Sequence, residues 1–199
     1  MMMKPVLFGL LITGFCFGQT LSVGVLGGAP FSDVVNNGTF APINTVVTSS
    51  NFTVGPSVQL NLPLNLRVEL DALYRPYGFK LFNQLIAAPV NNGTSVSGQQ
   101  WSFPLLVQYR FPFPIVQPFV EVGPSFQHLT GAGSLTSTIT GPGQLLHSSN
   151  IGVVFGGGVD VKVPFVRLSG ELRYTRQTTS YFSNISNLNQ AEVLFGIHF

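Results

Sequence analysis

Hydrophobic and polar residues alternate one by one along several segments of this chain, as they do in a β-strand whose two faces meet different surroundings. In the clearest segment, Leu66, Val68, Leu70, Ala72 and Tyr74 alternate with Arg67, Glu69, Asp71, Leu73 and Arg75. Because every second side chain of a strand lies on the same face, one face here is apolar and the other carries four charges.

The same alternation places most charged residues of the chain on one face of successive strands. Of nine basic and seven acidic residues, six of each fall on that face: Arg67, Arg75, Arg110, Lys162, Arg167 and Arg173, with Glu69, Asp71, Glu121, Asp160, Glu171 and Glu192. The other four, Lys4, Asp33, Lys80 and Arg176, fall in the N-terminal segment or in predicted loops. Bulky hydrophobic residues occupy the opposite face. The pattern therefore predicts a barrel with a charged interior and a lipid-facing exterior.

The alternating segments predict eight strands, each close to the ~9–11 residues that a tilted strand needs to cross a bilayer. They cover residues 20–30, 51–61, 66–77, 100–110, 116–128, 150–162, 165–177 and 188–199. Long connections alternate with short ones: 31–50, 78–99, 129–149 and 178–187 are long, whereas 62–65, 111–115 and 163–164 are short. Outer-membrane barrels combine long external loops with short periplasmic turns. We therefore expect an all-β, eight-stranded antiparallel up-and-down transmembrane barrel with both termini in the periplasm and the long loops outside the cell.

Composition favours the membrane over a soluble alternative. Charged residues make up 8% of the chain, against about a quarter in soluble domains. A soluble lipocalin-like barrel would bury the apolar face and expose the charges, and alternation alone does not separate the two folds. The low charge and the regular change of loop length favour the membrane barrel. The net charge of +2 is small and scattered, so we expect no nucleic-acid partner.

The first 18 residues have the layout of a secretory signal peptide. Lys4 precedes an apolar run over residues 6–17, and cleavage before Gln19 fits this layout. Cys16, the single cysteine, suggests a lipoprotein as an alternative, which Phe15 directly before it disfavours. We expect a signal peptide at 1–18 and the barrel at 19–199.

Aromatic residues gather near the predicted strand ends, where the girdles of membrane barrels lie. Near the loop ends these are Phe52, Tyr74, Tyr77, Phe79, Trp101, Phe126 and Tyr174, and near the turn ends Tyr109, Phe111, Phe113, Phe165 and Phe199.

The C-terminal segment has hydrophobic residues at every second position and ends on Phe195, Ile197 and Phe199. It resembles the signal that the outer-membrane assembly machinery recognises. More broadly, the chain resembles the outer membrane protein β-barrel domain family in the segments 27–33, 72–75, 118–125 and 172–176. The resemblance implies the barrel architecture and a place in the bacterial outer membrane. It also implies outer-membrane lipid, lipopolysaccharide and the assembly machinery as partners, with the barrel as a monomer.

The interior decides between functional classes. An eight-stranded barrel is just wide enough for side chains to fill it, and buried ions must pair or stay hydrated. We therefore expect the charges, together with Gln59, Gln108, Gln117, Gln127 and Gln190, to rigidify the barrel in a structural, envelope or surface-interaction role. The alternative is a narrow passive pore, in which Gly24, Gly152, Gly156 and Gly158 leave a gap or accommodate arginine side chains.

A second alternative is an enzyme. His147, Ser149 and Asn150 form a string similar to the His-x-Ser-Asn motif of outer-membrane lipid A deacylases, which implies roles as base, nucleophile and oxyanion donor. Asp160, the acid on that strand, lies roughly 40 Å from His147 along an extended chain and on the other face. We therefore expect no catalysis. His128 and His198 belong to no metal-ligand cluster, and we expect neither metal nor cofactor.

Overall fold

The computed structural model describes residues 21–32, 38–40, 43–47, 52–83, 94–130, 147–179 and 188–199. The predicted signal peptide and parts of the predicted loops lie outside this range. The described strands are β1 (Leu21–Pro30), β2 (Gly38–Phe40), β3 (Ile43–Val47), β4 (Thr53–Asn61), β5 (Leu66–Asp71), β6 (Leu73–Asn83), β7 (Thr94–Arg110), β8 (Val116–Thr130), β9 (Ser149–Lys162), β10 (Arg167–Gln177) and β11 (Asn189–His198).

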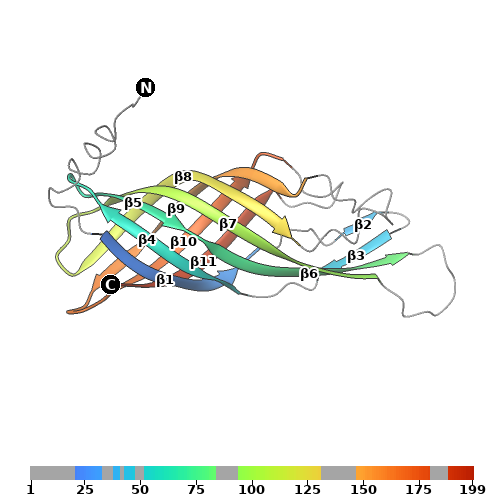
Figure 1. The fold of residues 1–199 in the computed structure, drawn as a ribbon, viewed down its shortest axis with the longest axis horizontal. Coiled ribbons are helices and arrows are strands. Elements are labelled where there is room, and N and C mark those ends of the chain that lie inside the picture. Colours follow the sequence, from blue (N-terminus) through green and yellow to red (C-terminus); the bar gives the residue numbers. More distant parts are fainter. Residues whose placement is uncertain are drawn as a thin grey trace, which may run out of the picture.

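The strands form one closed antiparallel barrel (Figure 1). The first strand, β1, pairs with β4 on one side and with the last strand, β11, on the other, so the sheet has no open edge around the barrel wall. Strands β5 and β6 are successive halves of one barrel strand, interrupted at Ala72, and β2 and β3 form a short hairpin attached to β6. The prediction of an eight-stranded up-and-down barrel is confirmed.

Tight turns join the strands at the end of the barrel where the C-terminus lies (Figure 1). In the turn between β4 and β5, Leu64 and Asn65 have φ angles of 62° and 61°. Two successive residues with positive φ define the type I′ geometry, whose twist matches that of the flanking strands. We call this end the turn end and the opposite end the loop end.

The predicted loops 31–50 and 78–99 contain more strand than the sequence suggested. Strands β6 and β7 continue past the predicted boundaries and remain paired there, with Gly78 opposite Ser97 and Lys80 opposite Ser95. The segment at the start of β7 is rich in Ser, Thr, Gly and Gln, so it lacks the apolar face on which the prediction relied. Arg176, counted above among the loop residues although the predicted strand 165–177 includes it, lies within β10.

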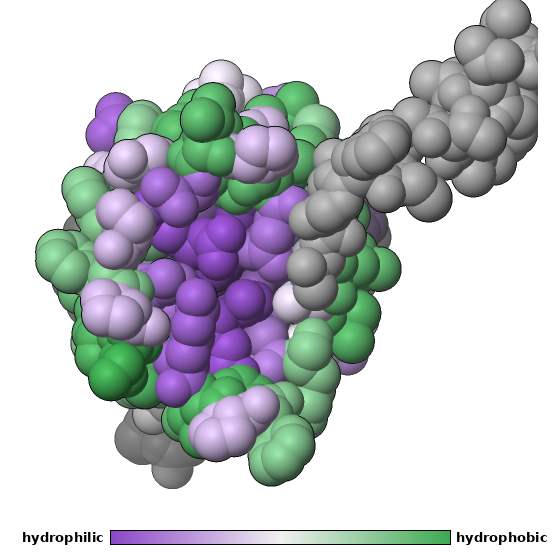
Figure 2. Space-filling model, turned by 90° about the vertical axis from the view of Figure 1, so that its left-hand side faces the viewer, coloured by the Kyte–Doolittle hydropathy of each residue, from purple (hydrophilic) through white to green (hydrophobic). Residues whose placement is uncertain are grey.

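The two faces of the sheet confirm the predicted alternation. Arg67, Glu69 and Asp71 are at most 1% exposed, whereas Leu70 is 50% exposed. Seen from the turn end, hydrophilic side chains fill the interior within a surrounding wall of hydrophobic residues (Figure 2). An apolar outer surface of this extent fits lipid rather than water, so the lipocalin-like alternative is wrong.

A small apolar cluster also lies inside the barrel. Leu26, Leu73 and Leu194 are at most 2% exposed and contact one another. Tyr77 is likewise buried at 6% exposure, so its predicted place in the outer aromatic girdle is wrong: it shares the inward parity of Arg75. No helix long and apolar enough to span a bilayer occurs in the described part of the chain.

Candidate functional site

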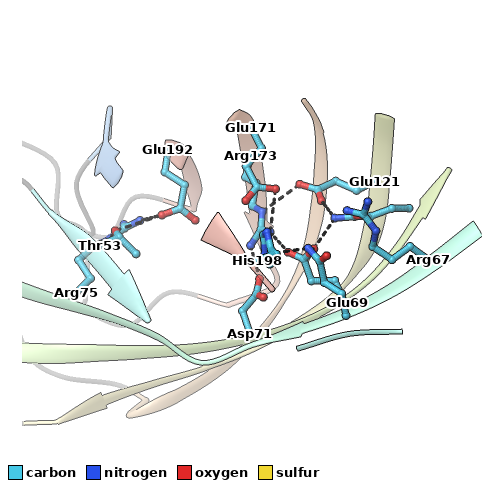
Figure 3. A network of polar contacts seen from close by, with 12 residues as sticks. Thr53, Arg67, Glu69, Asp71, Arg75, Glu121, Glu171, Arg173, Glu192 and His198 are labelled. Carbon is cyan, nitrogen blue, oxygen red and sulfur yellow. Dashed lines mark hydrogen bonds and ion pairs between the residues drawn. The ribbon is translucent and has the colours of Figure 1, made fainter. Parts of the chain in front are cut away.

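Arg173 is the centre of the charged interior. Its guanidinium group donates to Glu69 at 2.6 Å, Asp71 at 2.7 Å, Glu121 at 3.0 Å and Glu171 at 3.1 Å. All five side chains are buried. One cation therefore faces four carboxyl groups, an arrangement we call the Arg173 cluster (Figure 3).

Three barrel strands supply the Arg173 cluster. Glu69 and Asp71 come from β5, Glu121 from β8, and Glu171 from β10 beside Arg173 itself. On β9 the residue opposite Glu121 is Gly156, and a Cβ atom there would lie only 2.3 Å from a Glu121 carboxylate oxygen. The glycine thus leaves room for a glutamate, whereas the sequence had suggested room for arginine.

A second charged layer lies at the turn end and contains mostly bases. Arg67 and Asp160 form a fully buried ion pair, and Arg167 lies 3.6 Å from the same aspartate. Arg110 and Lys162, at the last positions of β7 and β9, form no ion pair with another described residue. The interior charges are therefore separated along the barrel axis, with excess positive charge at the turn end and excess negative charge in the middle.

Two glutamines connect these layers. Gln108 accepts a hydrogen bond from Arg67 at 2.9 Å and donates to Glu69 at 2.9 Å and Glu121 at 2.8 Å. Gln59 accepts from Arg167, donates to Glu69, and lies 3.0 Å from the ring nitrogen of His198. An amide carries both a donor and an acceptor, so each glutamine can link a cation to an anion.

Polar contacts continue toward the loop end. Arg75 forms an ion pair of 2.6 Å with Glu192, and Thr53 hydrogen-bonds to both residues. Beyond this pair the interior contacts among described residues are uncharged: Gln127 accepts from Gln100 at 2.8 Å and from Gln177 at 2.9 Å. The interior is thus built in successive polar layers.

Most of the charged residues predicted for the interior occupy it, with one clear difference. Eleven of the twelve are buried or half-buried, whereas Lys162 is exposed at the turn end. Parity assigned Lys162 to the inward face correctly, but a residue at the last position of a strand can reach solvent. Sequence reasoning gave His198 no place in the interior contacts, although alternation places it on the inward face of β11.

The acidic residues raise the question of a metal ion. Glu69, Glu121 and Glu171 offer oxygen atoms within 4.8 Å of one another. Arg173 already donates to all three carboxyl groups. These oxygens therefore have a cationic partner within the chain, and we assign no metal to them.

The His147 string does not assemble as the lipid A deacylase motif implied. The hydroxyl of Ser149 shares a hydrogen bond of 2.8 Å with His128 of the neighbouring strand β8. The Asn150 side chain is buried and bonds to Gln177 and Thr179, so it points away from the exposed serine. Cross-strand pairing of His128 with Ser149 explains the contact, and no pattern within one strand could have indicated it.

The three residues of the predicted assembly signal project from the outer surface. Phe195, Ile197 and Phe199 are 65%, 48% and 70% exposed, while Leu194 and His198 point inward. The last strand therefore presents a hydrophobic row on the side that faces lipid.

A closed antiparallel barrel with a charged interior and a hydrophobic exterior is the architecture of a bacterial outer-membrane protein. Residues 17–182 match the family described as "Outer membrane protein beta-barrel domain", and the chain belongs to this family. Its location is accordingly the bacterial outer membrane.

A solved structure agrees with this architecture. The fold is similar to that of Neisserial surface protein A, with a TM-score of 0.55 and 16% sequence identity, covering 91% of this chain and 97% of that chain. The N-terminal β-barrel domain of Pseudomonas aeruginosa OprF matches with a TM-score of 0.44 and 15% identity, covering 89% of this chain and 97% of that chain. No curated protein matches the sequence.

Proposed function

We propose that this protein is a structural outer-membrane barrel whose interior is closed to ions and whose long loops face the outside of the cell. The Arg173 cluster carries this proposal, because its side chains meet across the lumen from β5, β8 and β10. A guanidinium group bound to four carboxyl groups stabilises the barrel wall from within and occupies the path that an ion would follow.

The space next to this cluster supports a closed lumen. Between Arg173 and the Arg75–Glu192 pair lies a cavity of about 10 Å³. A cavity needs roughly 10–15 Å³ to hold one water molecule. A continuous column of water does not fit there, so the passive pore is the weaker alternative.

Conductance of the purified protein in planar lipid bilayers tests this proposal. The wild-type barrel is expected to give no discrete channel, whereas Arg173→Ala opens the constriction and gives measurable events. Arg176→Ala is the matched control, because Arg176 lies on the same strand but is exposed and contacts Asn189 outside the lumen. Steady wild-type channels whose conductance is unchanged by Arg173→Ala would contradict the closed interior.

The orientation is a separate part of the proposal. Short turns and termini belong to the periplasm and long loops to the exterior in barrels of this kind. Val90→Cys, between β6 and β7 in the sequence, should react with an impermeant maleimide on intact cells. Leu64→Cys, in a tight turn, should react only after the outer membrane is opened. The reverse labelling would show that the barrel is inverted.

The partners follow from this placement. Outer-membrane lipid and lipopolysaccharide surround the barrel, and the assembly machinery inserts it. A closed sheet offers no edge for strand pairing between copies, so we propose a monomer, which light scattering in detergent would test. The loops are the surface available to an external ligand. A variant with shortened loops that keeps every envelope and adhesion phenotype would contradict a surface-interaction role.

A further inference from the structure

A groove of about 520 Å³ lies on the outside of the barrel near the loop end. Its lining includes Phe103, Phe126, Ile151, His128, Ser149 and Thr179. These residues come from β7, β8, β9 and the segment that follows β10. Gln127 and Asn150, whose side chains are buried in the interior, also line it. The groove therefore borders the uncharged layer of the interior at the loop end and lies apart from the charged layers.

Strand register arranges the outward-facing lining residues of β7, β8 and β9 in two rows. His128 is opposite Ser149 on one side and opposite Trp101, a neighbour of the lining, on the other, and this row carries the polar groups. Two residues further toward the turn end, Phe103 is opposite Phe126 and Phe126 is opposite Ile151. This second row is entirely hydrophobic. The groove thus changes from polar to apolar along the direction of the membrane normal.

Aromatic contacts indicate the level of the polar row. Trp101 packs edge-on against Tyr74 with ring centroids 5.3 Å apart, and it stacks on Phe103 at 6.4 Å. Trp and Tyr side chains prefer the level of the lipid headgroups. The hydrogen-bonded pair His128–Ser149 lies in the same row as Trp101, so it is placed at headgroup level, with Phe126 on the side of the hydrocarbon.

We propose that this groove binds one molecule of lipopolysaccharide. An acyl chain lies against Phe103, Phe126 and Ile151, and the acylated sugar headgroup hydrogen-bonds to His128 and Ser149. Two observations favour a lipid over a water-soluble ligand: the groove is continuous with the lipid-facing belt, and its polar-to-apolar order matches an amphiphile. The choice of lipopolysaccharide rests on the proposed orientation, because it places the loop end in the outer leaflet.

Trp101 is the only tryptophan of the chain. It is opposite His128 and stacks on Phe103, two residues that line the groove, so its fluorescence reports on their surroundings. Refolded protein in detergent is titrated with purified lipopolysaccharide and, separately, with phosphatidylethanolamine. Lipopolysaccharide is expected to shift the emission saturably. Ser149→Ala and His128→Ala each remove one hydrogen-bonding partner and should weaken binding about tenfold. Phe126→Ala removes the central ring of the apolar row and should weaken it by at least as much.

The matched control variants lie on the same lipid-facing surface of the barrel but outside the groove. Phe155→Ala removes a ring of nearly equal exposure, 52% against 53% for Phe126. Tyr174→Phe removes a hydroxyl that bonds to Asn189 at 2.8 Å. Both should bind lipopolysaccharide as the wild type does. The heat-induced gel shift verifies folding of each variant, and Ile151→Ala tests the apolar row if Phe126→Ala does not fold.

The outcomes separate this inference from the proposed orientation. Equal affinity of lipopolysaccharide for the wild type and all groove variants would overturn the site, and surface labelling would be unaffected. Saturable binding of phosphatidylethanolamine alone, lost in Ser149→Ala, would overturn the choice of lipid. Labelling of the Val90→Cys variant on intact cells would then show whether the orientation had failed as well.

Discussion

Glu121 occupies the space that a side chain on Gly156 would need. The two residues face each other across β8 and β9, and a Cβ atom at Gly156 would approach a Glu121 carboxylate oxygen to 2.3 Å and the Leu172 backbone oxygen to 2.8 Å. Gly156→Ala is therefore expected to push Glu121 away from Arg173 and to lower the free energy of unfolding by about 1–3 kcal/mol. Urea unfolding of the barrel in lipid vesicles measures the change.

Gly27→Ala is the control for this substitution. A Cβ atom at Gly27 would have no neighbour within 4 Å, and alanine restricts the unfolded chain more than glycine does. We expect no loss of stability at Gly27. Equal losses at both positions would mean that the Glu121 contact is not the cause.

Replacing Arg173 tests the interior more severely. Arg173→Met leaves the carboxyl groups of Glu69, Asp71, Glu121 and Glu171 without their shared cation. Removing one partner of a buried ion pair costs about 3–5 kcal/mol, so a loss of this size in the free energy of unfolding is expected. Arg176→Met, at an exposed position of the same strand, should change it by less than about 1 kcal/mol.

The Arg75–Glu192 pair suits a double-mutant cycle. The two side chains are 2.6 Å apart and only 9% and 12% exposed. Arg75→Gln or Glu192→Gln alone leaves a charge unpaired in the interior, whereas the double variant leaves none. We expect the double variant to lose less stability than the sum of the single variants, with a coupling of about 0.5–3 kcal/mol. Strict additivity would show that the pair contributes no interaction energy.

A charge on the outer face tests the lipid-facing assignment. Leu70 projects from the wall at 50% exposure, and arginine near the bilayer midplane of a barrel costs roughly 2–4 kcal/mol. Leu70→Arg should lower stability by that amount in vesicles. Ile115→Arg, in a turn at 64% exposure, should cost about 0–1 kcal/mol, the range expected near the interface. If Leu70→Arg left the free energy of unfolding unchanged, this would contradict burial of the outer face in lipid.

The C-terminal row tests recognition by the assembly machinery. Phe199 is 70% exposed, and its backbone pairs with Val23 of β1. Phe199→Ser should slow insertion into the outer membrane in cells and leave more unassembled protein. Unfolding of the assembled barrel should change little, because the side chain is not packed inside. Normal insertion kinetics, measured by pulse-chase and gel shift, would argue against the signal. Phe165→Ser, at a turn residue that is 92% exposed, controls for loss of an outer ring.

The sequence indicated the barrel because alternation is a local property of each strand. The segment from Leu66 to Asp71 shows on its own which side chains face inward, and its neighbours repeat the pattern. The boundaries of β6 and β7 were harder to predict. The outer part of β7 carries polar residues on both faces, and that of β6 mixes polar and apolar residues on both faces, so neither shows the alternation on which the prediction relied.

Contacts within the interior depend on the height of each side chain along the barrel axis and on its position around that axis. Alternation along one strand gives neither, because it shows only which face a side chain occupies. Alternation placed Arg173 and Glu69 on the inward face, yet it could not show that one guanidinium group would meet four carboxyl groups. The partner of Ser149 illustrates the same limit. The His-x-Ser-Asn string pointed to His147, whereas strand pairing brings His128 to the serine.

The sequence by itself therefore determined the fold class, the two faces of the wall and the ends at which turns and long loops lie, because each follows from spacing along one strand. Only the tertiary structure decided that acids gather around Arg173, that bases gather around Asp160, and that the pair His128–Ser149 lies next to a row of hydrophobic side chains on the outside. Closure and stagger of the strands bring together residues more than a hundred positions apart, such as Gln59 and His198 at a separation of 139, and no pattern within one strand contains such a contact.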